Sequence, residues 1–207
     1  SRSLRRYLLP GSPVRRPASR LRFAACRTEQ DAERFVRLGV VPSRVCVAGD
    51  MKFDKLERPL GESARADLRR SLGVPDGAAV VVFGSVRPRE EPVVAQAAVE
   101  VVGSVPGSFA ILAPRHMDRV GALTRELSSL GLTPRMRSRG RDDQPGAGAL
   151  VLDTTGELAR VYSLGSVAFV GGTLAAYGGH DPLEPAGQGE PVVLGAHTES
   201  CRDAAER

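Results

Sequence analysis

The sequence predicts an α/β fold built on a doubly wound, Rossmann-like parallel sheet. Short apolar runs rich in β-branched residues alternate along the chain with segments of helical length. Several of these runs end directly in glycine or in a Pro-Arg pair, as buried parallel strands do when they lead into loops. Because connections between parallel strands are right-handed, we expect helices on both faces of the sheet.

Four helices are expected from apolar periodicity and from signals at their ends. The first, over residues 28–38, begins at Thr28 as N-cap and stops at Gly39. The others are expected over residues 62–72, 90–102 and 117–130.

Seven strands are expected between these helices. They cover residues 44–48, 79–83, 109–113, 133–136, 150–152, 167–170 and 191–194. A parallel sheet delivers the residues that follow its strands to one edge, where open α/β sheets bind ligands. We therefore expect a ligand site built from residues 49–52, 84–87, 114–116, 153–157 and 171–184.

Positive charge is concentrated at the start of the chain. The net charge is +5, yet residues 1–22 hold seven arginines and no acid, so the rest of the chain is slightly acidic. Such a segment can meet anionic lipid head groups, bind RNA or simply remain solvated. With six Phe, three Tyr and no Trp, the chain offers no aromatic platform for stacking bases, and we expect no nucleic-acid partner.

Composition argues against several other classes of protein. No apolar run approaches the length of a membrane span, and the first residues lack the apolar core of a signal peptide, so the cytosol is the expected location. Three cysteines without a CxxC pair, Cys26, Cys46 and Cys201, predict neither a disulfide framework nor a zinc cluster. We expect no metal and no cofactor.

The segment from Ser166 to Gly195 is the most informative part of the chain. Its first strand runs into Gly171, and the loop that follows ends at the start of a short helix near Glu184. Amide groups at a helix start attract anions, and a glutamate there can accept hydrogen bonds from sugar hydroxyls, so a nucleotide would suit both groups. An ordinary capped helix, with Asp181 as N-cap, explains the same spacing.

Four motifs resemble the 3-deoxy-D-manno-octulosonic acid (Kdo) transferases. They are GDMKFDK at 49–55, APRH at 113–116, DTTGELARVY at 153–162, and the segment 169–198. The resemblance implies a GT-B glycosyltransferase of bacterial lipopolysaccharide biosynthesis that transfers Kdo from CMP-Kdo to a lipid A precursor. It further implies an inverting, metal-independent enzyme at the cytoplasmic face of the inner membrane, held peripherally by anionic lipid.

The resemblance also implies a domain division. Residues 1–25 would be the tail of an amino-terminal acceptor domain and its linker, and residues 26–207 the CMP-sugar-binding carboxyl-terminal domain, truncated at its end. The family's base glutamate lies in the acceptor domain, outside this chain. On this interpretation we expect the chain alone to be soluble and inactive.

Site residues follow from the motifs that match the family. Lys52 would stabilise charge on the departing phosphate. Ser85 would hydrogen-bond the donor, although Val86 replaces a hydroxyl of the family pattern. The residues expected to contact CMP are Pro114, Arg115, Thr155, Gly156, Glu157, Asp181, Pro182, Leu183 and Glu184.

Simpler interpretations of these residues remain open. Arg115 can be an exposed arginine in a turn, and Glu157 a favourable acid in a first helical turn. Asp181 stands where the family has asparagine, and an ionised aspartate would repel a phosphate, although it caps a helix equally well. Two other functions stay possible. One is a sugar-nucleotide epimerase of similar fold that prefers UDP, and the other is a non-catalytic module that binds through the arginine-rich residues 1–22, the basic arm.

Overall fold

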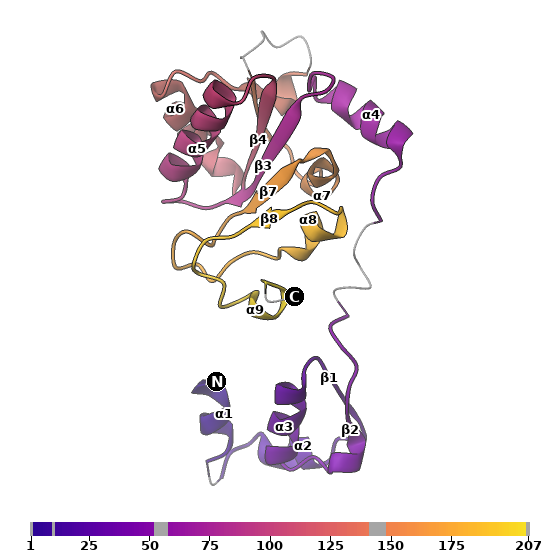
Figure 1. Cartoon of the computed structure of the whole chain (residues 1–207). Helices are drawn as coiled ribbons and strands as arrows, with labels where there is room; N and C mark the ends of the chain where they lie inside the picture. The colour runs from indigo at the N-terminus through magenta and orange to yellow at the C-terminus, as the bar shows by residue number, and fades with distance from the viewer. Residues whose placement is uncertain (1, 10, 52–57, 141–147, 206–207) are drawn as a thin grey trace. The chain divides into compact units, whose positions relative to one another are not determined.

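The chain folds into two compact units in the computed structural model, which describes residues 2–9, 11–51, 58–140 and 148–205 (Figure 1). The smaller unit is Ser1–Lys55 and the larger is Leu56–Arg207. The boundary between these two compact units therefore lies well after residue 25, at which the family resemblance placed a domain boundary. The reason is that a strand and a helix after residue 25 pair and pack with the segment that precedes them.

The smaller unit contains three helices and a two-stranded parallel sheet among its described residues. The sheet pairs β1 (Ala24–Cys26) with β2 (Val45–Val47). The expected strand over 44–48 thus exists but belongs to this unit, which corrects the seven-stranded sheet that we predicted. The helices are α1 (Arg2–Tyr7), α2 (Arg15–Ser19) and α3 (Glu29–Arg37), with a short 3-10 turn, η1 (Pro42–Arg44), before β2.

The N-cap of α3 is the one predicted. The Thr28 hydroxyl accepts a hydrogen bond from the backbone N–H of Asp31 at 3.1 Å. This bond satisfies one of the free amide groups of the first turn.

The larger unit is a six-stranded, wholly parallel sheet in the order β5-β6-β4-β3-β7-β8 (Figure 1). The doubly wound α/β fold predicted from the sequence is confirmed. Its strands are β3 (Ala79–Val86), β4 (Ser108–Pro114), β5 (Arg135–Met136), β6 (Ala149–Val151), β7 (Val167–Val170) and β8 (Val192–Val193). Its helices are α4 (Glu62–Ser71), α5 (Glu91–Ser104), α6 (Val120–Ser129), α7 (Leu158–Val161), α8 (Leu183–Gly187) and α9 (Arg202–Ala205), with 3-10 turns η3 (Met117–Arg119), η4 (Arg137–Arg139) and η5 (Tyr162–Leu164).

Helices cover both faces of this sheet because successive strand residues point to opposite sides. Val80 and Val82 pack into a core with residues of α4, α7 and η5. Phe83 lies in a second core on the other face, formed with α5 and α6. Each core is continuous across the central strands, so the sheet holds its carboxyl edge in a fixed position.

The side on which successive strands are added to the sheet changes at β3. From β3 the chain proceeds to β4 on one side, and β7 later adds on the other side. Ligands of doubly wound sheets bind at such a switch point, in the crevice outside the carboxyl ends of the strands. We therefore expect a ligand site at the loops after β3 and β7.

These two loops approach each other so closely that one position requires glycine. Ser85 interrupts β3 with a φ of +54°, at a shift of register between Phe83 and Val86. A Cβ added to Gly171 would overlap the carbonyl group of Ser85 and lie 2.9 Å from the Cα of Val86. Only a residue without a side chain fits there.

We predict that Gly171→Ala destabilises the larger unit by about 1–3 kcal/mol, because the added methyl group must displace the backbone of β3. Gly103→Ala is the matched control, since Gly103 lies in α5 with nothing within 4 Å of an added Cβ. That change should stabilise the protein by about 0.5–1 kcal/mol. Thermal unfolding followed by circular dichroism measures both, and equal effects in the two variants would contradict the close approach.

Candidate functional site

Two of the predicted segments are joined at the centre of the carboxyl edge. Val86 of β3 and Pro114 of β4 are partners in register. The backbone N–H of Arg115 donates to the carbonyl of Val86 at 2.8 Å. Arg87 and Arg115 each directly follow one member of this register pair, so their backbones lie side by side.

A fully buried carboxylate, Glu90, ties the loop after β3 to the loop after β7. Its Oε2 accepts hydrogen bonds from the backbone N–H groups of Arg87 at 2.9 Å and Gly172 at 2.8 Å. Its Oε1 accepts from the N–H of Leu174 at 2.9 Å. Glu90 is 0% exposed, so these donors replace water as its hydrogen-bonding partners. This role could not be predicted from the sequence, because a glutamate before a helix normally indicates only a favourable first-turn charge.

The glycine-rich loop is fastened on its other side by Thr173. The buried Thr173 hydroxyl donates to the carbonyl of Val170 at 2.7 Å and accepts from the N–H of Gly195 at 2.8 Å. The Thr173 carbonyl accepts from the N–H of His197 at 2.9 Å. Glu90 and Thr173 therefore hold the loop after β7 in place without a ligand.

The Arg87 guanidinium is oriented by two neighbours. It lies over the ring of Tyr177, 4.9 Å from the ring centroid, and its Nη1 is 2.8 Å from Nε2 of His116. The Tyr177 hydroxyl donates in turn to the carbonyl of Pro88 at 3.0 Å. Since an arginine can only donate, Nε2 of His116 is the accepting atom of this contact.

His180 lies in this positive environment. Burial lowers the pKa of His180, and the nearby Arg87 and Arg115 lower that pKa further. Its Nε2 atom is buried without a hydrogen-bond partner among the described residues. The ring lies against the loop backbone, since a Cβ on Gly172 would be 3.0 Å from its Cδ2. These contacts agree with a loop-ordering histidine.

The predicted segment after β6 is held by an ion pair that the sequence did not indicate. Arg137 Nη2 lies 2.8 Å from Oε1 of Glu157, and the Thr154 hydroxyl also donates to this carboxylate. The hydrogen bond from Arg137 is the main cause that lowers the pKa of Glu157. Thr155 and Gly156 are exposed in the same turn. Glu157 is thus ionised and already engaged, whereas the two residues before it face solvent.

The short helix α8 begins one residue later than the capping interpretation predicts, because Pro182 and not Asp181 occupies the N-cap position and no side chain caps the helix. The Asp181 carboxylate accepts a hydrogen bond from the backbone N–H of Leu183 at 3.1 Å. Pro182 precedes the first residue of the helix, and Glu184 is exposed in its first turn. Asp181 therefore has a structural role that an asparagine would fill equally well.

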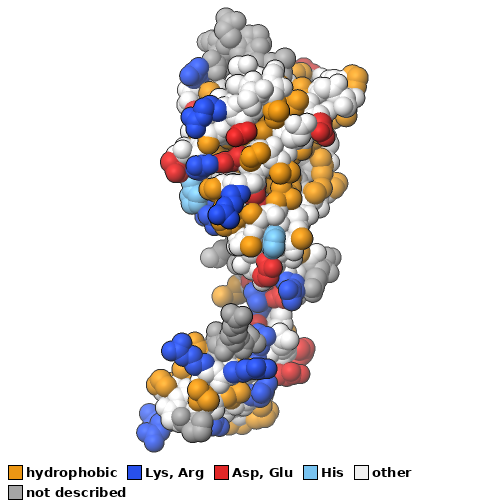
Figure 2. Space-filling model, turned by 90° about the vertical axis from the view of Figure 1, so that its left-hand side faces the viewer, with side chains coloured by type: hydrophobic (Ala, Val, Ile, Leu, Met, Phe, Trp, Pro, Cys, Tyr) orange, Lys and Arg blue, Asp and Glu red, His pale blue; other side chains and the backbone are white. Residues whose placement is uncertain are grey.

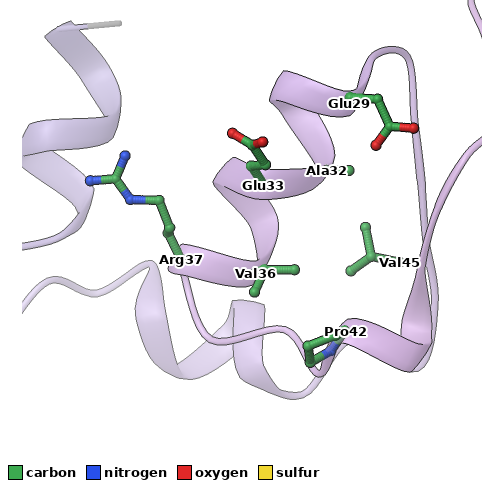
Figure 3. A pocket seen from close by; sticks show the side chains of 7 residues that line it. All are labelled: Glu29, Ala32, Glu33, Val36, Arg37, Pro42 and Val45. Atoms are coloured by element: carbon green, nitrogen blue, oxygen red, sulfur yellow. The ribbon is translucent and has the colours of Figure 1, made fainter.

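Lys52 lies outside the described residues, and the strand before it, β2, belongs to the smaller unit. Residues 49–51 thus follow a strand of the smaller unit and not a strand of the six-stranded sheet. A groove on the smaller unit runs along α3, where Val36 and Val45 line it (Figure 3). None of the predicted site residues lines this groove.

Neither a metal site nor a membrane-spanning helix occurs in the part of the chain that the structure describes. There, no three His, Cys, Asp or Glu side chains cluster in a way that would hold a metal ion. Among the same residues, no helix has both the length and the apolarity to cross a membrane.

Comparison with known proteins shows which proteins the chain resembles. The family model described as 3-deoxy-D-manno-octulosonic-acid transferase (kdotransferase) matches residues 1–55, the extent of the smaller unit. The Kdo transferase of Chlamydophila psittaci is 33% identical over 186 residues, covering 86% of this chain and 40% of the relative. The chain is similar in sequence to the Kdo transferases. The Kdo transferase of Bordetella pertussis is 29% identical over 211 residues, covering 98% of this chain and 47% of its own length.

A solved structure resembles the chain in fold as well. It is the C-terminal CMP-Kdo binding domain of WaaA from Acinetobacter baumannii, with a TM-score of 0.62 and 26% identity over 76% of this chain and 77% of that one. The larger unit therefore has the architecture of a GT-B carboxyl-terminal domain. The chain spans less than half the length of the two Kdo transferases compared above.

We predict that Glu90→Ala destabilises the larger unit by about 3 kcal/mol, because three backbone N–H groups lose their acceptor. Glu90→Gln, which keeps one accepting oxygen, should fall between this variant and the native chain. Glu100→Ala is the control, since Glu100 is exposed on α5, and it should change stability by less than about 0.5 kcal/mol. Urea unfolding followed by circular dichroism provides the measurement, and identical midpoints for all four proteins would refute this role of Glu90.

Proposed function

We propose that this chain provides the donor-binding part of a Kdo transferase and holds CMP-Kdo at the carboxyl edge of its six-stranded sheet. One observation carries the proposal: two arginines follow a register pair at the switch point of the sheet, beside a glycine loop already locked by Glu90. Fixed cations and a rigid loop suit a nucleotide phosphate, since little ordering remains to be done on binding.

The individual contacts follow the motifs. Arg115 binds the phosphate, and Ser85 and Pro114 border it. Glu184 accepts hydrogen bonds from the ribose, with Pro182 and Leu183 fixing the start of its helix. The exposed turn of Thr155 and Gly156 contacts the nucleotide, with Glu157 holding that turn through Arg137, and Asp181 holds the backbone N–H of Leu183.

The transfer itself needs groups that other parts of a Kdo transferase supply. We propose an inverting, metal-independent displacement in which CMP departs and the sugar becomes oxocarbenium-like. Lys52 stabilises the negative charge on the departing phosphate. A base glutamate outside this chain deprotonates the acceptor, a lipid A precursor.

We predict that CMP stabilises the chain against heat. A ligand at 100 times its dissociation constant adds about 2.7 kcal/mol to the stability of the state it binds. Arg115→Gln should abolish most of this shift, whereas Arg125→Gln, at an exposed position of α6, should preserve it. Thermal unfolding with and without CMP makes the measurement.

The same experiment distinguishes the competing enzyme. A sugar-nucleotide epimerase of similar fold would be protected by UDP rather than by CMP. No shift with millimolar CMP, or a larger shift with UDP, would overturn the assignment to CMP-Kdo.

The basic arm supports a peripheral location at the cytoplasmic face of the inner membrane. Arg15, Arg16, Arg20 and Arg22 are all exposed, and the neighbouring Phe23 is 61% exposed. Basic and apolar side chains share the surface of the smaller unit (Figure 2). Arginines attract anionic head groups, and exposed apolar side chains can enter the interface beneath them.

We predict binding to vesicles that contain phosphatidylglycerol, decreasing with added salt, and none to vesicles of phosphatidylcholine alone. The double variant Arg15→Gln/Arg16→Gln should weaken this binding by about 2 kcal/mol, at about 1 kcal/mol for each basic residue. The control removes two exposed arginines from the larger unit, Arg125→Gln/Arg160→Gln. Co-sedimentation gives the affinities, and equal losses in the two double variants would argue against an arm-specific contact.

A further inference from the structure

Arg87 and Arg115 form a pair of neighbouring cations. They follow the register partners Val86 and Pro114, and adjacent strands of a sheet lie about 4.8 Å apart. No carboxylate lies within ion-pair distance of either guanidinium in the part of the chain that the structure describes. Two uncompensated guanidinium groups at one sheet edge form a site for more than one negative charge.

Glu90, the buried acid of this edge, forms no ion pair with either guanidinium among the described residues. Glu90 is buried, and its two oxygens accept three backbone N–H groups. The positive field of the two arginines acts on His180, whose pKa falls mainly through burial and further through both guanidinium groups. Arginine and histidine side chains lie next to one another on one flank of the larger unit (Figure 2).

The side chain of Arg87 is also held in one orientation by its neighbours. Its backbone N–H is fixed by Glu90, its guanidinium lies over Tyr177, and its Nη1 contacts His116. A guanidinium held in one orientation offers two parallel N–H donors at little further cost in entropy. A carboxylate, with two coplanar oxygens, matches this fork.

The chemistry of an ulosonic acid places two anions where such a pair can meet them. In a CMP-activated 2-ulosonic acid, the anomeric carbon carries both the carboxylate and the oxygen that links it to phosphorus. The two negative groups are therefore separated by one carbon and one oxygen atom. A nucleotide linked to a neutral sugar has only the phosphate at this position.

We propose that Arg87 binds the carboxylate of the sugar acid while the neighbouring Arg115 binds the phosphate. The proposal rests on the donor-binding function proposed above and names the residue that selects an acidic sugar. Arg87 is thus a specificity-determining residue, and Tyr177 and His116 are the residues that position it.

The test compares two ligands across three variants of the chain. CMP-Kdo carries both anions, and the methyl ester of CMP carries the same phosphodiester without a carboxylate. Arg87→Gln should weaken CMP-Kdo by about tenfold or more, the loss expected when hydrogen bonds to a charged group disappear. It should weaken the methyl ester by less than about threefold, because that ligand lacks the partner of Arg87.

Arg115→Gln serves as the matched control and should weaken both ligands alike, because both contain the phosphate. Arg87→Lys keeps the charge without the planar fork and should recover only part of the loss. It also carries the comparison if Arg87→Gln proves unable to fold, as judged by circular dichroism. Isothermal titration calorimetry on the full chain gives each dissociation constant.

The outcomes separate the two proposals. If the native chain binds neither ligand, the donor-binding function itself fails. If it binds both, and the Arg87 variants weaken both equally or neither, the donor site stands and the assignment of the carboxylate to Arg87 is overturned.

Discussion

The three hydrogen bonds accepted by the buried Glu90 are the constraint on which the carboxyl edge of the sheet depends. They join the turn after β3 to a loop more than eighty residues later in the chain. A buried carboxylate requires hydrogen-bonding partners, and the backbone N–H groups of a tight loop require an acceptor. Glu90 and the loop backbone satisfy each other, and the two loops are thereby joined into one support.

This support explains why the arginines at the edge are useful. The turn that Glu90 fixes carries Arg87, and the register pair of β3 and β4 puts Arg115 beside it. Neighbouring cations repel each other, so the folded chain must hold them together with energy from elsewhere. Here the central strands and the two apolar cores provide that energy, and a doubly charged ligand would release the repulsion.

Not all residues that match the family motifs are free to bind a ligand. Glu157 is paired with Arg137, and Asp181 accepts a hydrogen bond from the backbone N–H of Leu183, just before Glu184. Aspartate in place of asparagine is acceptable there because this bond needs only an accepting oxygen. These residues hold the turns in which they lie, whereas Thr155 and Arg115 are exposed.

The sequence by itself determined the local features of this protein. The Thr28 cap, the central strands and the doubly wound fold all follow from periodicity and end signals, which act over a few residues. Tertiary structure alone decided three things: that β2 pairs with β1 instead of joining the large sheet, that the units divide at residue 55, and that Glu90 holds the loop after β7. The physical reason is that partners distant in the chain leave no periodic trace: a strand shows its apolar residues but not its neighbour, and a glutamate shows its charge but not its three donors.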